Sequence, residues 1–227
     1  MTREELNNYI DNCILLGNII TKESKIYKTL SKHKYGYLWN NLLDSVYLNG
    51  MYLKRDEENN IHLVYYDGEY EVLDLGDCID IIDEYSFATT IIRVIGWEET
   101  EYHPKRKKLV SISGDSVISI GYYAFSESSV RIVDFPNVER IGVCCFKDSN
   151  VEEVALNNLE DVSNNAFSGS SIRKFYGEKV IGVDGLAFES CTKLEYVYIP
   201  NAEYVDDRAF WKCKNLCNAN VIINKRN

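Results

Sequence analysis

Apolar residues recur along most of this chain with a period of 21 or 22 residues. Most copies centre on a phenylalanine that follows a small residue, as in Ala124-Phe125. One apolar column lies five residues before each phenylalanine, and another lies eight residues before it. A fixed period in this range predicts a solenoid, in which each copy packs mainly on its neighbours. The phenylalanines are Phe87, Phe125, Phe146, Phe167, Phe188 and Phe210.

A second pattern follows each phenylalanine and reads apolar-x-x-apolar-x-apolar. Val130, Val133 and Phe135 form one such triplet, and residues 92–97 are assigned to the first copy. The last two apolar positions alternate with polar residues, which is the period of a strand with one buried face. Stacked copies therefore predict a narrow parallel β-sheet that runs along the solenoid.

Two segments show the repeat most clearly: residues 120–125 read Ile-Gly-Tyr-Tyr-Ala-Phe, and residues 187–200 run from Ala-Phe through Cys and Leu to Val-Tyr-Ile-Pro. With these units the chain resembles the BspA-like leucine-rich repeat family over about residues 70–227. The resemblance implies an α/β fold, a leucine-rich-repeat solenoid with a narrow parallel β-sheet on its concave face. It also implies a binding role rather than catalysis.

The residues before the repeats have a different character. Thr2 and Glu5 have the spacing of a capping box, and a helical apolar pattern follows as far as Gly17. Further helical patterns run near 22–34 and over 38–50, so residues 1–50 are predicted to form a helical N-terminal region. Residues 51–69 are predicted to form a β-hairpin leading into the solenoid, with Asp67-Gly68 as a turn before residues 70–75. We interpret this part as a cap for the solenoid, with a functional helical module as the alternative.

The period breaks once, because Phe125 follows Phe87 by 38 residues. The break predicts an insertion at about 98–116, with the form of a protruding β-hairpin and a basic tip. A surface for an acidic protein partner and a solvated loop are both consistent with such a charge run. The basic residues at the tip are His103, Lys105, Arg106, Lys107 and Lys108.

The positions between the apolar residues of each strand are predicted to point outward on the concave face. Three tyrosines fall there beside charged residues, and tyrosine is favoured in interfaces because it offers a large area with a polar tip. A cross-strand ladder that only stabilises the sheet is the alternative. The candidate partner-binding residues are Ile132, Asp134, Glu153, Lys174, Tyr176, Tyr196 and Tyr198.

Composition and motifs exclude several classes of function. The formal net charge of −10 argues against binding to nucleic acid or to an anionic membrane. No nucleophile elbow, phosphate-binding loop or dinucleotide motif is present, so the chain is not expected to be an enzyme. No cofactor and no metal are expected, because Cys191 and Cys213 have no CxxC or Cys/His neighbours. The acidic cluster that includes Asp80 and Asp83 is interpreted as turn chemistry.

The expected function is therefore a non-catalytic protein-protein interaction module. A cell-surface adhesin or carbohydrate-binding protein of the BspA-like type is the alternative. The first residues lack the pattern of a secretory signal and the seven cysteines are an odd number, so a cytoplasmic location is expected. A strand near the C-terminus, residues 221–223, has an edge through which a homodimer could form.

Overall fold

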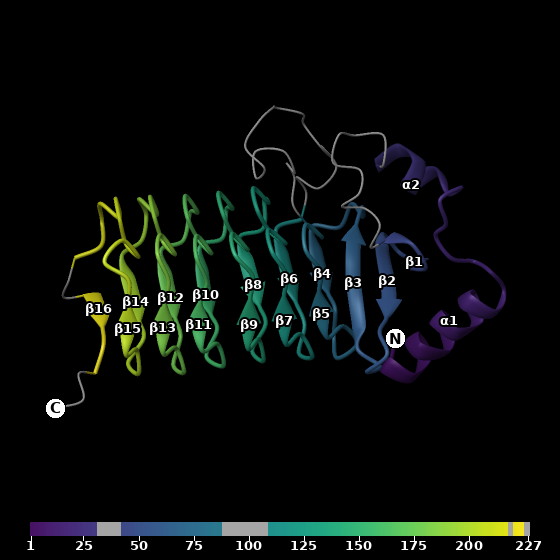
Figure 1. Ribbon diagram of the computed structural model, residues 1–227, viewed down its shortest axis with the longest axis horizontal. Coiled ribbons are helices and arrows are strands. Elements are labelled where there is room, and N and C mark those ends of the chain that lie inside the picture. The colour runs from purple at the N-terminus through teal and green to yellow at the C-terminus, as the bar shows by residue number, and fades with distance from the viewer. Residues whose placement is uncertain (31–41, 88–108, 218–219, 225–227) are drawn as a thin grey trace.

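The computed structural model describes residues 1–30, 42–87, 109–217 and 220–224. Its strands stack side by side along the long axis of the molecule, and the two helices lie at the N-terminal end (Figure 1). The predicted leucine-rich-repeat solenoid and its helical and hairpin cap are confirmed.

One side of the solenoid is a sheet of seven parallel strands, each two or three residues long. In every three-residue strand the middle side chain is buried, as Val133 and Phe175 are, while its neighbours face outward. The alternation predicted from the triplets is therefore confirmed. In spatial order the strands are β16 (Val221–Ile222), β14 (Tyr196–Tyr198), β12 (Lys174–Tyr176), β10 (Glu153–Ala155), β8 (Ile132–Asp134), β6 (Ser111–Ser113) and β4 (Val72–Asp74).

A second row of strands lines the opposite side. Each is two residues long and ends at the apolar column five residues before a phenylalanine, so Ile120 and Ile141 point into the core. The sequence pattern identifies this column as buried but does not predict it as strand, because two residues are too few to show a period. These strands are β5 (Ile81–Ile82), β7 (Ser119–Ile120), β9 (Arg140–Ile141), β11 (Asp161–Val162), β13 (Gly182–Val183) and β15 (Tyr204–Val205).

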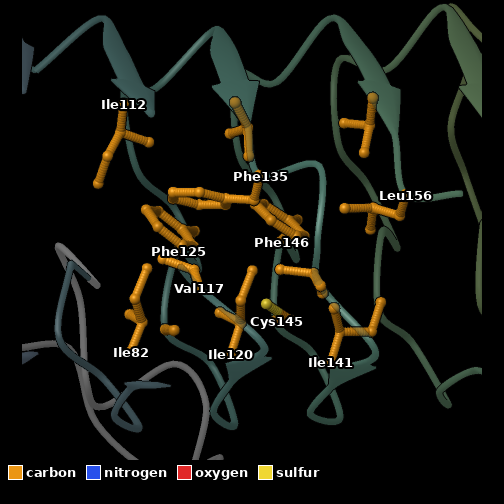
Figure 2. Close-up of a cluster of buried hydrophobic side chains, with 14 of the residues drawn as sticks. Ile82, Ile112, Val117, Ile120, Phe125, Phe135, Ile141, Cys145, Phe146 and Leu156 are labelled. Carbon is orange, nitrogen blue, oxygen red and sulfur yellow. The ribbon is translucent and has the colours of Figure 1, made fainter. Parts of the chain in front are cut away.

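The phenylalanines fill the space between the two rows of strands as one continuous stack. Neighbouring ring centroids from Phe87 to Phe210 are 4.7–5.3 Å apart, and neighbouring planes lie within 17° of parallel. Figure 2 shows part of this core, where Phe135 approaches the stack from the side of the seven-stranded sheet. Each buried apolar side chain contributes about 1.5–3 kcal/mol, and only stacking of the copies buries them.

The turns beside the phenylalanines place non-glycine residues in the left-handed region. Tyr123 and Glu127, two positions before and after Phe125, have φ of 55° and 56°, and the equivalent residues beside Phe146 and Phe188 behave in the same way. Such a conformation costs about 1–2 kcal/mol per residue. Backbone bonds to the next repeat offset that cost, since the Tyr123 and Glu127 amides donate to the carbonyls of Val143 and Lys147.

The N-terminal region contains one long helix, a short helix and an antiparallel meander. Helix α1 (Arg3–Leu15) begins with the predicted capping box of Thr2 and Glu5, and α2 spans Lys25–Leu30. Strands β1 (Val46–Leu48), β2 (Met51–Arg55) and β3 (Ile61–Tyr66) pair in sequence order. Because β3 then pairs with β5 in parallel, the meander extends the sheet of the second side and covers the end of the solenoid.

Two predictions for this region are wrong. The helix predicted over 38–50 does not include residues 46–48, which form β1, because Val46 is buried and Tyr47 is exposed in the alternation of a strand. Asp67-Gly68 does not turn the chain into a hairpin. From β3 the chain crosses to β4, in the seven-stranded sheet.

The predicted insertion at 98–116 is also wrong in part. Residues 111–113 form β6, which pairs with β4 on one side and β8 on the other, so they belong to the regular sheet. The buried triplet beside β6 is Leu109, Ile112 and Gly114, whereas the triplet predicted at residues 92–97 lies outside the described residues. Glycine at the third apolar position and serines beside Ile112 conceal the match in the sequence. The additional residues of the 38-residue step therefore precede Leu109.

Candidate functional site

The seven predicted partner-binding residues lie together on one surface, which we call the strand face. It consists of the outward-facing side chains of β8, β10, β12 and β14, arranged in two rows by the parallel register. Ile132 is 57% exposed, and Asp134 and Glu153 are also exposed, whereas the other four are partly exposed. One row is Ile132, Glu153, Lys174 and Tyr196; the other is Asp134, Ala155, Tyr176 and Tyr198.

The tyrosines gather at the C-terminal half of the strand face. The rings of Tyr176 and Tyr196 are 5.7 Å apart at an angle of 47°, and Tyr198 lies opposite Tyr176 on the adjacent strand. Within the part of the chain that the structure describes, no hydrogen bond occupies the hydroxyl groups of these three tyrosines. The rings therefore pack partly on one another, and their polar tips remain available to a partner.

Charged groups adjoin the tyrosines. The Nζ atom of Lys174 lies 3.6 Å from Oε2 of Glu153, and the two side chains are 44% and 58% exposed. Solvent screens such a pair strongly, so it holds the two groups only weakly. Both charges can therefore reorient towards a partner at little cost.

An alternating ladder of charges borders the strand face, one residue before each strand. Arg131 makes two hydrogen bonds to the carboxylate of Glu152, of 2.8 and 3.0 Å, and Arg173 makes two to Glu195, of 3.1 and 3.2 Å. The hydrogen bonds with Arg131 lower the pKa of Glu152 and raise that of Arg131. The predicted site does not include this ladder, although Arg, Glu, Arg and Glu at one repeat position are the signal for it in the sequence.

A hollow lies on the side of the molecule opposite the strand face, where the β2–β3 hairpin meets the first repeats. This junction pocket has a volume of about 420 Å³ and is lined by residues that include Lys54, His62, Ile81, Glu84 and Tyr122. Volumes of 300–1,000 Å³ are typical of small-molecule sites. Sequence reasoning misses the pocket because its lining residues come from four strands, β2, β3, β5 and β7, that are separate in the chain.

The wall of the junction pocket is a hydrogen-bonded chain of three side chains. Nδ1 of His62 lies 2.7 Å from the Asp83 carboxylate, and Nε2 lies 3.2 Å from that of Asp56. The bond with Asp83 raises the pKa of His62, although burial opposes it. Burial alone would raise the pKa of Asp56, but bonds from Asn60 and His62 lower it to about 2. When it is protonated, the imidazole donates to both carboxylates and joins the hairpin to the first turn of the solenoid.

Two members of the acidic cluster of the first repeat, Asp80 and Asp83, have structural partners, as the interpretation of turn chemistry expects. Asp80 accepts hydrogen bonds from both terminal nitrogens of Arg3 and from the amide of Ile61. The thiols of Cys191 and Cys213 donate to the carbonyls of the preceding repeats. Among the described residues, no three His, Cys, Asp or Glu side chains are grouped to hold a metal ion. All seven cysteines are described and none forms a disulfide.

The insertion surface and the homodimer are not tested. The basic residues His103, Lys105, Arg106, Lys107 and Lys108 lie outside the described residues. Strand β16 pairs with β14 and with no other strand of the described part, so a homodimer through its edge stays a prediction. No helix within the described ranges is both long and apolar enough to cross a membrane.

Comparisons with known proteins agree with this architecture. A family model described as "BspA type Leucine rich repeat region" matches residues 101–217 in six copies. The fold is similar to that of a leucine rich cell surface protein from Faecalibacterium prausnitzii A2-165, with a TM-score of 0.53 and 18% identity over 80% of this chain and 40% of that one. A leucine-rich repeat protein from Eubacterium ventriosum is similar with a TM-score of 0.48 and 12% identity, over 71% of this chain and 43% of that one. No curated protein matches the chain.

Proposed function

Because the chain belongs to the BspA-type leucine-rich repeat family, we propose that it is a non-catalytic module that binds a protein partner through its strand face. The observation that carries the proposal is the grouping of Tyr176, Tyr196 and Tyr198 in adjacent strands beside Lys174 and Glu153. Parallel pairing in register presents these side chains as one surface on a rigid sheet. A rigid site loses little conformational entropy when a partner binds.

The chemistry of the strand face suits a protein interface. Tyrosine combines a large apolar ring with a hydroxyl that needs a hydrogen-bond partner once it is desolvated, and it is enriched among the residues that dominate binding energy. The exposed side chain of Ile132 and the carboxylates of Asp134 and Glu153 extend the surface towards the N-terminal half. A partner with apolar groups opposite the tyrosines and basic groups opposite Asp134 would complement it.

The test compares capture of proteins from the source organism by three immobilised forms of the full chain. The variant Tyr176→Ala/Tyr196→Ala/Tyr198→Ala should lose the specific partner, and binding of that purified partner should weaken at least about tenfold, or about 1.4 kcal/mol. Tyr70→Ala/Tyr204→Ala is the matched control, since both tyrosines are exposed and neither lies on the strand face. Equal retention of the same partner by all three forms would refute the assignment.

Adhesion at a cell surface is a second candidate, favoured by the similar fold of the Faecalibacterium protein, which is described as a leucine rich cell surface protein. The present chain spans 40% of that protein. Fractionation of the native cells distinguishes this candidate from the expected cytoplasmic location. Release by external protease from intact cells would favour adhesion, and protection would favour the cytoplasm.

A further inference from the structure

The junction pocket is built by an element that the repeats alone do not supply. Across the sheet of the second side, the register places Lys54 of β2 beside His62 of β3, His62 beside Ile81 of β5, and Ile81 beside Ser119 of β7. Neighbouring strands are about 4.8 Å apart, so this row spans about 14 Å. The hairpin forms one wall, and the turns that follow β5 and β7 form the other.

Most of the polar groups in the pocket already have partners. Both ring nitrogens of His62 are bonded to carboxylates, and Asp56 also accepts two hydrogen bonds from Asn60. Glu84 differs, because among the described residues its carboxylate has no hydrogen-bond or ion-pair partner. Burial raises the pKa of Glu84, and the neighbouring Asp83 raises it further. The pocket thus contains a half-buried carboxylate beside another acid, and among the described residues no cation forms an ion pair with it.

The neighbours of Glu84 suit an alkylammonium group. Tyr122 occupies the same repeat position on the next turn and is 53% exposed. The two turns are in close contact, since a Cβ atom on Gly121 would lie 2.5 Å from the amide nitrogen of Glu84. Ile81 faces outward and provides an apolar floor. A carboxylate next to an aromatic ring attracts an ammonium group through a charged hydrogen bond and a cation–π contact.

We propose that the junction pocket binds the ammonium group of a small organic amine, with the charge against Glu84 and the alkyl stem over Ile81 and Tyr122. The cations Lys54 and His62 lie on the hairpin side of the pocket, so a second positive charge on the ligand is disfavoured there. The same ammonium chemistry is found in a free amine, in an amino acid and in the lysine side chain of a peptide. The site lies on the opposite side of the solenoid from the strand face and is independent of the proposed partner binding.

The test is an NMR titration of the ¹⁵N-labelled full chain with butylamine, followed at the amides of Glu84 and Tyr122. We expect saturable shifts of these amides with butylamine, and none with 1-butanol or butyrate. Parallel titrations with 4-aminobutyrate and with Nα-acetyllysine amide distinguish amino-acid ligands from peptide lysines. Glu84→Gln keeps the shape of the side chain, removes its charge, and should weaken butylamine binding at least about tenfold.

Matched variants keep the test decisive. Glu160→Gln removes an exposed carboxylate outside the pocket and should bind butylamine as the unmodified chain does. Tyr122→Leu retains the charge of Glu84 and should weaken binding less than Glu84→Gln. Equal shifts with 1-butanol and butylamine, or unchanged affinity in a folded Glu84→Gln variant, would overturn the proposal. The Tyr176→Ala/Tyr196→Ala/Tyr198→Ala variant should bind butylamine normally, which separates this site from the strand face.

Discussion

The solenoid and its N-terminal cap are held together in different ways. In the solenoid one set of contacts recurs every 21 or 22 residues, so the inner phenylalanines each stack between two others and each turn bonds to the next. In the cap each contact occurs once: Arg3 with Asp80, Arg55 with Asp11, and His62 with Asp83. When one contact of the solenoid is lost, equivalent contacts remain in the other repeats. When one contact of the cap is lost, no equivalent remains, and a helix or hairpin can detach.

The largest effect is expected from Phe167→Ala, in the middle of the stack. Phe167 is fully buried, and its ring lies between those of Phe146 and Phe188 at 5.1 and 5.2 Å. Removal of the ring leaves a cavity and should lower the free energy of unfolding by about 3–5 kcal/mol, measured by urea denaturation.

The matched variant is Phe210→Ala, in the last phenylalanine of the stack. Phe210 is only partly buried and has one stacked neighbour, Phe188. Phe210→Ala should lower the free energy of unfolding clearly less than Phe167→Ala does. Equal losses in the two variants would show that position in the stack does not matter and would contradict the view of the solenoid as additive repeats.

A smaller, local effect is expected from Asp80→Ala in the cap. The side chain of Asp80 is 13% exposed and joins Arg3 of α1 and the amide of Ile61 to the first repeat. Its removal leaves the Ile61 amide without this acceptor and should cost about 1–3 kcal/mol. Hydrogen exchange should accelerate in α1 and β3 while β10–β14 keep their protection. Asp134→Asn, on the exposed strand face, is the control, and acceleration throughout the chain would contradict the single-contact picture.

The smallest effect concerns pH and the bond between His62 and Asp83. Because the folded state raises the pKa of His62, the stabilisation is complete below the unfolded value of about 6.5 and is lost as pH rises through the folded value. The pKa of Asp56 is lowered to about 2 in the folded state, so its carboxylate stabilises the fold above the unfolded value of about 4. This stabilisation is lost as pH falls towards 2. The melting temperatures of the unmodified chain and His62→Gln should therefore differ most between about pH 4 and 6.5 and converge at alkaline pH. A difference independent of pH would show that the protonated imidazole does not hold the hairpin.

The fold of the repeats could be predicted from the sequence because periodicity reports burial. Phe125, Phe146 and Phe167 have equivalent surroundings, so their spacing in the sequence predicts that they belong to the same buried column. The predicted strand positions are wrong where the residue types depart from the repeat pattern. Ile112 lies between two serines and before Gly114, so the repeat pattern does not predict its strand. Leu42 and Val46 fit helical spacing, Val46 and Leu48 fit the spacing of a strand, and only pairing with β2 decides between the two.

The two candidate sites also differ in whether the repeat pattern predicts them. The strand face could be predicted because Lys174, Tyr176 and Tyr196 occupy repeat positions whose direction follows from the alternation. The junction pocket could not, because His62 belongs to the cap and meets Asp83 only after β3 has paired with β5. No periodic relation joins these residues in the chain, and Asp83 was adequately explained as a turn residue.

The left-handed turns have a consequence for how such a molecule can lengthen over evolution. Main-chain hydrogen bonds to the next repeat hold their conformation, such as those from Tyr123 to Val143 and from Glu127 to Lys147. These bonds do not depend on the identity of the side chains. A gene duplication that added one unit of 21 residues would therefore supply the new turn with every main-chain partner it needs, and the strand face would grow by one strand. The junction pocket would not be multiplied, because its hairpin wall exists once. Relatives with different numbers of repeats could thus vary the length of one surface while they preserve the other.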